Sequence, residues 1–130
     1  MKKQVNSSKA PRAIGPYSQG VRTGSLLFLS GQIPMNPDTG EIETGTIQDQ
    51  TWQVLSNLQE LLHAENLTTD NVVKVSVFLK DMNDFAALNA VYAEVFDMEV
   101  PPARECVEVS RLPRDVAVEI SLIAEYPESQ

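Results

Sequence analysis

Cysteine and histidine are almost absent from this sequence, which contains one of each. The single cysteine, Cys106, cannot form a disulfide within the chain, and such cysteine usage is typical of a reducing compartment. The single histidine, His63, excludes any site that needs two imidazole side chains, such as the zinc site of many proteases. We therefore expect a cytoplasmic protein without internal disulfides, whose fold depends on an apolar core.

Basic residues are also scarce, since 10 lysines and arginines stand against 18 acidic residues and give a formal net charge of −8. Nucleic-acid binding depends mainly on phosphate contacts, which so acidic a surface opposes. The sequence has no basic cluster, no apolar run of about 18 residues that could span a membrane, and no apolar stretch after Lys2 and Lys3 that would indicate a secretory signal. We therefore expect neither nucleic acid nor a membrane as a partner.

Several motifs that commonly identify enzymes are missing. The sequence has no glycine-rich phosphate-binding loop, no dinucleotide-binding glycine pattern and no Gly-x-Ser-x-Gly nucleophile turn. His63 lies near the expected end of a helix without a visible catalytic partner, so a serine–histidine–aspartate triad is not expected. The remaining candidates are Arg104, Glu119, Tyr17 and Ser30, which with backbone groups can hold a small carboxylate and position water without a cofactor or a metal ion.

Alternating and continuous apolar runs predict strands at residues 19–23, 26–32 and 72–80, with a tight turn at Gly24–Ser25 between the first two. The polar stretch before them, up to Gly15, is expected to form a short strand or an arm. In the run at 72–80, alternation predicts that one face carries Val73, Val75, Val77 and Leu79.

Two amphipathic helices are predicted between these strands and the C-terminal part of the chain. The first is capped by Thr46 or Asp49 and runs to about residue 65, and the second is capped by Asp81 or Asn83. The expected core-facing residues are Trp52, Leu55, Leu58, Leu61 and Leu62 in the first helix, and Phe85, Leu88, Tyr92, Val95 and Phe96 in the second. The whole chain, residues 1–130, is therefore expected to form one α+β domain.

The stretch 101–125 is expected to carry the chemistry. It contains two alternating runs, 104–109 and 116–124, separated by turn residues from Leu112. If the two strands pair across that turn, Arg104, Cys106 and Glu119 share one face of the sheet. Two interpretations of this group are open at this point: a carboxylate-binding site with an acid that orients water, or a structural ion pair.

Three other residues allow two interpretations each. Tyr17 follows the rigid Gly15-Pro16 turn and is either a half-buried tyrosine at a strand start or a phenol placed for binding. Gly31 either marks a bulge or lets a ligand or another chain approach the backbone closely. Asn89 lies beside the apolar stripe of the second helix, so its amide is either hydrogen-bonded within the fold or faces a cleft.

The sequence also predicts self-association. Two helices, each about 10 Å wide, can cover roughly four strands spaced about 4.8 Å apart, and only if both lie on one face of the sheet. The runs at 26–29 and 72–79, however, are apolar on both faces. The second face needs a cover that the chain itself cannot supply, and we therefore expect a homo-oligomer packed through its sheets.

Five segments resemble a known family in order and spacing: residues 13–19 (AIGPYSQ), 30–34 (SGQIP), 77–85 (VFLKDMNDF), 102–109 (PARECVEV) and 112–120 (LPRDVAVEI). Together they are similar to the RidA family, the YjgF-type reactive intermediate deaminases, from about Pro11 to Ala124. This resemblance implies a chorismate-mutase-like α+β subunit, with a mixed sheet, two helices on one face, and sheets that close into a homotrimer with clefts between neighbouring subunits.

The resemblance further implies hydrolysis of enamine and imine intermediates, such as 2-aminoacrylate (2-iminopropanoate) and 2-iminobutanoate, to 2-oxo acids and ammonia without a cofactor. In this reading Arg104 grips the substrate carboxylate, the backbone at Cys106 addresses the imine nitrogen, and Glu119 orients or activates water. The cleft is lined by Tyr17, Ser30, Gly31 and Asn89. Two alternatives are a non-catalytic trimer that binds 2-oxo acids in the same cleft and an RNA-cleaving translation inhibitor, which the acidic charge disfavours.

Overall fold

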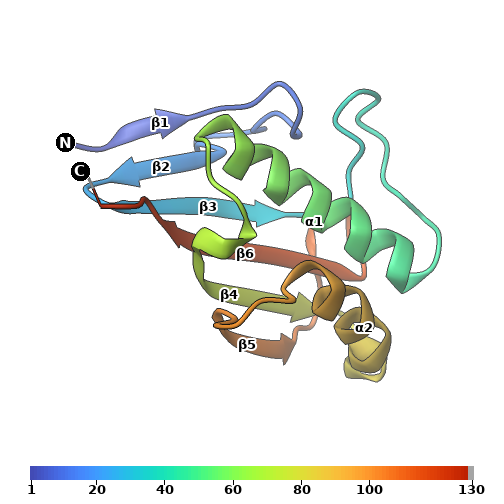
Figure 1. Cartoon of the computed structure of the whole chain (residues 1–130). Helices are drawn as coiled ribbons and strands as arrows, with labels where there is room; N and C mark the ends of the chain where they lie inside the picture. Colours follow the sequence, from blue (N-terminus) through green and yellow to red (C-terminus); the bar gives the residue numbers. More distant parts are fainter. Residues whose placement is uncertain (129–130) are drawn as a thin grey trace.

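The computed structural model describes residues 1–128, which form a six-stranded mixed sheet with two helices in front of one face (Figure 1). The helices are α1 (Ile47–Ala64) and α2 (Phe85–Val95). In spatial order the strands are β1 (Lys3–Val5), β2 (Gly20–Thr23), β3 (Leu26–Gln32), β6 (Val118–Glu125), β4 (Val72–Leu79) and β5 (Ala103–Glu108). Short 3-10 turns at Thr69–Asn71, Met82–Asp84 and Pro113–Asp115 connect these elements.

Most elements form where their local sequence signals placed them. The predicted hairpin is present, with β2 and β3 antiparallel and Thr23 paired with Leu26 across the Gly24–Ser25 turn. Helix α1 begins after Thr46, whose hydroxyl accepts a hydrogen bond from the Asp49 backbone while the Asp49 carboxylate accepts one from the Thr46 N–H. This reciprocal capping satisfies donors that a helix start otherwise leaves unpaired. Neither helix within residues 1–128 combines the length and the apolar character needed to cross a bilayer.

The core lies between the sheet and the two helices. Strand residues at alternate positions face the helices, and both helices bury one stripe. The largest fully buried side chains are Leu27, Val75, Val77, Leu79, Val118 and Ile120 from the sheet, Val54, Leu55, Leu58, Leu61 and Leu62 from α1, and Leu88 from α2.

The predicted core position of Trp52 is wrong, and so is the prediction that Val73 shares a face with Val75, Val77 and Leu79. Trp52 is 43% exposed, because the buried stripe of α1 begins with Thr51, Val54 and Leu55 instead. Val73 is also exposed, because the pairing of β4 with β6 shifts register between Val72 and Lys74. Such a bulge adds one residue to the strand and moves that side chain to the other face.

The predicted pairing of the last two strands is also wrong, because β4 lies between them. Strand β5 runs parallel to β4, and β6 runs antiparallel to β4 on its other side. A parallel pair requires a crossover connection, which α2 provides between β4 and β5. Strand β4 is apolar at six of its eight positions, so an interior place, where both of its edges pair with neighbouring strands, suits it.

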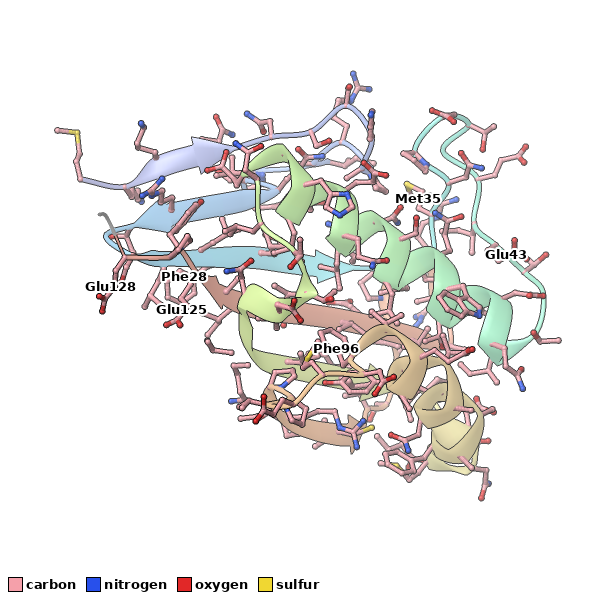
Figure 2. All side chains as sticks on the ribbon, viewed as in Figure 1. Phe28, Met35, Glu43, Phe96, Glu125 and Glu128 are labelled. Atoms are coloured by element: carbon pink, nitrogen blue, oxygen red, sulfur yellow. The ribbon has the colours of Figure 1, made fainter. Side chains whose placement is uncertain are left out.

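The face of the sheet opposite the helices, here called the open face, carries several exposed apolar side chains. Phe28 is 40% exposed and Val107 is 43% exposed, and Leu26 and Val73 are similarly accessible. These residues come from β3, β4 and β5, so the apolar surface extends across much of the sheet. Figure 2 shows Phe28 at the hairpin end of β3 and Met35 on the loop beyond its other end. The predicted shortage of cover is therefore present in the subunit.

Candidate active site

The residues expected to form a site separate into two groups, with Arg104 and Glu119 on opposite faces of the sheet. Arg104 pairs with the buried Val75 and therefore lies on the face that the helices cover, whereas Glu119 pairs with Phe78 on the open face. The expectation that Arg104, Cys106 and Glu119 share a face is thus wrong for a single subunit. We call Arg104, Cys106 and Asn89 the arginine half-site, and Tyr17, Ser30, Gly31 and Glu119 the glutamate half-site.

In the arginine half-site, the Arg104 guanidinium is held although the residue is exposed. Its Nη1 donates a hydrogen bond to Asn89 Oδ1 at 2.8 Å. Its central carbon lies 4.5 Å from the centroid of the Tyr92 ring and 5.5 Å from that of Phe85. Asn89 therefore serves the fold as a partner of Arg104, and the guanidinium keeps further N–H donors that can bind a planar carboxylate.

Cys106 lies two residues further along β5, on the same face as Arg104 and paired with Val77. It is partly buried, and this burial raises the pKa of its thiol, while the nearby Arg104 charge lowers it less. A thiol with a raised pKa stays protonated at neutral pH and is a poor nucleophile. The backbone of Cys106, rather than its sulfur, is thus the group to consider at this position.

The intervening residue, Glu105, points to the open face. Its carboxylate forms an ion pair with Lys74 Nζ at 2.9 Å and accepts a hydrogen bond from the Ser76 hydroxyl. These bonds, with that from Ser76 the larger cause, lower the pKa of Glu105. Glu105 is therefore a structural acid, and the alternation of β5 is confirmed.

The glutamate half-site is built on a bulge in β3. The pairing of β3 with β6 shifts register between Leu29 and Gln32. The two residues Ser30 and Gly31 of β3 therefore lie opposite a single residue of β6. A Cβ atom on Gly31 would come within 2.9 Å of Cδ of Glu119. Gly31 is thus both a bulge residue and a site of close approach, because only a residue without a side chain leaves room for the Glu119 carboxylate.

Glu119 itself is partly buried, and burial raises the pKa of its carboxyl group. Desolvation disfavours the ionised form, and no charge within residues 1–128 offsets this effect. A carboxylate whose pKa is raised is a stronger base than an ordinary one, which suits it to accept a proton from water.

Tyr17 lies on the loop before β2, not at a strand start as one interpretation had it, and it is 51% exposed. Its hydroxyl oxygen accepts a hydrogen bond from the Ile14 N–H at 3.2 Å. Gly15, at φ +124°, lets the loop fold back for this contact. Because the phenol oxygen is engaged as an acceptor, its proton remains available for donation to a ligand.

Ser30 is oriented in the opposite sense. Its hydroxyl donates to the Ser18 carbonyl at 2.6 Å, and its N–H donates to the Gln19 carbonyl at 3.0 Å. The Ser30 proton is thus used within the fold, which leaves the hydroxyl oxygen as an acceptor. The two hydroxyl groups of the glutamate half-site therefore present one donor and one acceptor.

A cavity of about 240 Å³ connects the Tyr17 loop with Gly31. It is lined in addition by Ile14, Met35, Pro113 and Arg114, which the sequence did not single out. Arg114 has a left-handed backbone, at φ 58°, in the turn before β6. A positive φ angle in a residue other than glycine is uncommon, and the sequence did not predict it here.

The match with known proteins covers nearly the whole chain. Residues 7–126 match the family model described as Endoribonuclease L-PSP. A RutC family protein of Pyrococcus horikoshii is 55% identical over 124 residues, which cover 95% of this chain and 98% of the relative. The Escherichia coli protein named "Putative reactive intermediate deaminase TdcF" is 48% identical over 126 residues, 95% of this chain and 97% of its own length.

The chain belongs to the RidA/YjgF/TdcF family. Solved structures of the RidA family share its fold. The E. coli YjgF gene product superimposes with a TM-score of 0.91 at 45% identity, over 96% of this chain and 99% of that one. E. coli TdcF, crystallised with bound serine, gives a TM-score of 0.91 at 46% identity over the same shares. The α+β architecture with a mixed sheet and two helices is therefore that of the family.

The sequence of this RidA-family chain did not predict that aromatic rings surround Arg104. Phe85 and Tyr92 were predicted only as core residues of the second helix. Phe85, Asn89 and Tyr92 are spaced four and three residues apart, which places them on one face of α2. That spacing was visible in the sequence, but its relation to Arg104 depends on β5 lying beneath α2, which the incorrect strand pairing concealed.

Proposed function

We propose that this protein hydrolyses reactive enamine and imine intermediates, such as 2-iminopropanoate and 2-iminobutanoate, to 2-oxo acids and ammonia. The observation that carries this proposal is the Arg104 guanidinium, held by Asn89 at 2.8 Å with further donors free to grip a carboxylate. Membership of the RidA family and the name given to the E. coli relative TdcF support the same activity. Imines hydrolyse readily unaided, so a held substrate and a positioned water suffice.

The active site that we propose is shared between subunits. Arg104 lies on β5 and Gly31 on β3, three strand spacings or about 14 Å apart, and Glu119 points from the other face of the sheet. One subunit therefore cannot bring its two half-sites together around a small molecule. In a homotrimer, edge strand β5 of one copy would meet the open face of its neighbour, whose exposed Phe28 and Val73 favour such burial.

The proposed reaction uses the groups of both half-sites. Arg104 binds the substrate carboxylate, and the backbone at Cys106 holds the imine nitrogen. Glu119 takes a proton from a water molecule, whose oxygen adds to the C=N carbon to give a carbinolamine, and returns the proton to nitrogen. Glu119 then accepts the proton of the carbinolamine hydroxyl group and passes it to the amino nitrogen. The C–N bond breaks with its electron pair on nitrogen, ammonia leaves and the carbonyl of the 2-oxo acid forms. Tyr17, Ser30 and Gly31 line the cleft and orient the intermediate.

The activity can be tested by supplying the imine continuously. A threonine dehydratase generates 2-iminobutanoate from threonine, and release of 2-oxobutanoate is followed with and without this protein. We expect faster release of the 2-oxo acid, in proportion to the amount of protein. We also expect the free imine to disappear faster, so that less of it is captured when semicarbazide is added as a trap. Release that is unchanged at every protein concentration would contradict the proposed hydrolysis.

A binding protein that uses the same cleft is the second candidate, and the serine bound to TdcF is the observation that favours it. The same assay separates the two functions. A binding protein would show saturable binding of 2-oxobutanoate by calorimetry while leaving the rate of imine loss unchanged. An enzyme would change that rate at concentrations far below those of the substrate.

Mixing two inactive variants tests whether the site is shared. Arg104→Ala and Glu119→Gln subunits, refolded together in equal amounts, should recover about a quarter of wild-type activity, because each site then draws its two half-sites at random from the two kinds of subunit. Each variant refolded alone should keep no more than about 3% of wild-type activity, and sedimentation should show a trimer in all samples. Mixed samples no more active than the separate variants, or a folded monomer with wild-type activity, would refute the shared site.

A further inference from the structure

Arg104 rests against an aromatic surface formed by helix α2. Its guanidinium carbon is 4.5 Å from the centroid of the Tyr92 ring. Tyr92 is only 7% exposed, and its own ring packs against Phe96 with centroids 4.5 Å apart. The ring beneath Arg104 is thus fixed in the core, whereas Arg104 itself is exposed to solvent. An exposed, charged side chain therefore lies against a buried aromatic ring.

The hydroxyl group of Tyr92 contributes nothing visible to this arrangement. It is buried, and within the part of the chain that the structure describes it has no hydrogen-bond partner. A buried hydroxyl without a partner costs free energy relative to a phenyl ring of the same shape. The useful part of Tyr92 is therefore its ring face, whose negative charge density attracts a guanidinium.

Asn89 and Tyr92 restrain the guanidinium in complementary ways. The hydrogen bond to Asn89 Oδ1 fixes the direction of one edge of the group, and the Tyr92 ring limits how far the group can move off its surface. Both residues belong to α2 and are three positions apart, so the same helix face supplies both restraints. An unrestrained arginine would lose rotamer freedom each time it bound a carboxylate.

We propose that Tyr92 is a positioning residue, whose ring holds the Arg104 guanidinium ready to bind the substrate carboxylate. This inference rests on the proposed function only in taking a carboxylate as the ligand of Arg104. It assigns the effect to the aromatic ring of Tyr92 and not to its hydroxyl group. Phe85, 5.5 Å from the same guanidinium and partly buried, provides a weaker second wall.

The test compares substitutions that keep or remove the ring. Tyr92→Phe should retain kcat and KM within about twofold. Tyr92→Leu should raise KM by about 5- to 30-fold with a smaller change in kcat, because the cation–π contact is lost and substrate binding must then also order Arg104. Val91→Ala, which truncates another buried residue of α2, is the matched control for destabilisation and should leave KM unchanged. Equal KM values for Tyr92→Leu and Val91→Ala would overturn the proposal.

A second comparison shows whether Tyr92 acts through Arg104. Lysine has no planar group to rest on the ring, so in an Arg104→Lys background the further change Tyr92→Leu should raise KM by less than about twofold. An undiminished effect of Tyr92→Leu in that background would mean that Tyr92 acts independently of Arg104, which contradicts a positioning role.

A measurement without substrate separates this inference from the proposed function. In arginine-labelled wild-type protein, NMR should show slow rotation about the Nε–Cζ bond of Arg104 and a ring-current shift, in contrast to the exposed Arg12. Both features should persist in Tyr92→Phe. If Arg104 rotates as freely as Arg12 in the wild type, the positioning role is wrong even where the enzyme turns over imines. If Arg104 is held but no imine is hydrolysed, the positioning role stands and the proposed function fails.

Discussion

Replacing Arg104 with alanine is expected to reduce kcat/KM for 2-iminobutanoate by about 30- to 1,000-fold, which corresponds to a loss of about 2–4 kcal/mol of transition-state binding. The substrate carboxylate loses its charged partner. Asn89 Oδ1 also loses the hydrogen bond that it accepts from Arg104 Nη1 at 2.8 Å. The measurement is a full kinetic curve with enzymatically generated imine. Because the carboxylate is bound in both ground and transition states, we expect much of the loss in KM.

Two further arginine variants define what Arg104 contributes. Arg104→Lys keeps the charge but loses the planar pair of donors, so its kcat/KM should fall between those of the wild type and Arg104→Ala. Arg111→Ala is the control for loss of a surface charge, because Arg111 pairs with Asp115 at 2.6 Å in the turn before β6. It should have wild-type kinetics. A kcat/KM of Arg104→Ala within about threefold of the wild type would refute the role of Arg104.

The elements of the fold could be predicted from sequence, because each rests on signals a few residues apart. Thr46 and Asp49 are capping residues and predicted the start of α1. Gly24 is a turn residue and predicted the β2–β3 turn, and the structure has both features at these positions. The neighbours of β5 and β6 in the sheet could not be predicted in this way. Alternation gives the two faces of a strand, but which strand lies beside it depends on how the whole sheet packs against the helices.

The site shows the same limit. Alternation placed Arg104 and Cys106 together and the glycine signal located Gly31, and both features are present. Arg104 and Glu119 nevertheless lie on opposite faces, because they pair with Val75 and Phe78 of β4, and residues an odd number of positions apart on a strand point to opposite faces. Tyr92 was expected to be buried and is, yet its ring also faces Arg104. One residue can be part of both the core and a functional site, and the periodicity of apolar residues predicts only its place in the core.

Replacing Glu119 with glutamine is expected to lower activity while raising stability. If Glu119 takes the proton from water, glutamine cannot replace it, and kcat should fall by about 100- to 10,000-fold with little change in KM. Burial raises the pKa of Glu119, so its ionised form is disfavoured in the folded protein. Glutamine resembles the neutral acid, and Glu119→Gln should therefore melt at a higher temperature at pH 7. Unchanged kcat would remove Glu119 from the mechanism.

The sign of the pH dependence follows from the raised pKa. A carboxyl group whose folded-state pKa lies above its ordinary value of 4.5 stabilises the fold below that pH and loses this contribution as pH rises through the folded-state pKa. The melting temperatures of wild type and Glu119→Gln should thus agree near pH 4 and separate toward neutral pH. A difference that is constant with pH would mean that Glu119 is not desolvated.

Gly31 provides an independent way to move the same carboxylate. A methyl group at position 31 would overlap the Glu119 side chain, so Gly31→Ala must displace either the acid or strand β3. If the acid moves, kcat should fall and the acid limb of the kcat/KM profile should shift toward the ordinary carboxyl pKa, since the group becomes more hydrated. Adding Gly31→Ala to Glu119→Gln should then cost little further activity, because both changes remove the same placed proton acceptor. Full additivity of the two losses would instead show that Gly31 acts on the strand, and that its approach to Glu119 has no catalytic consequence.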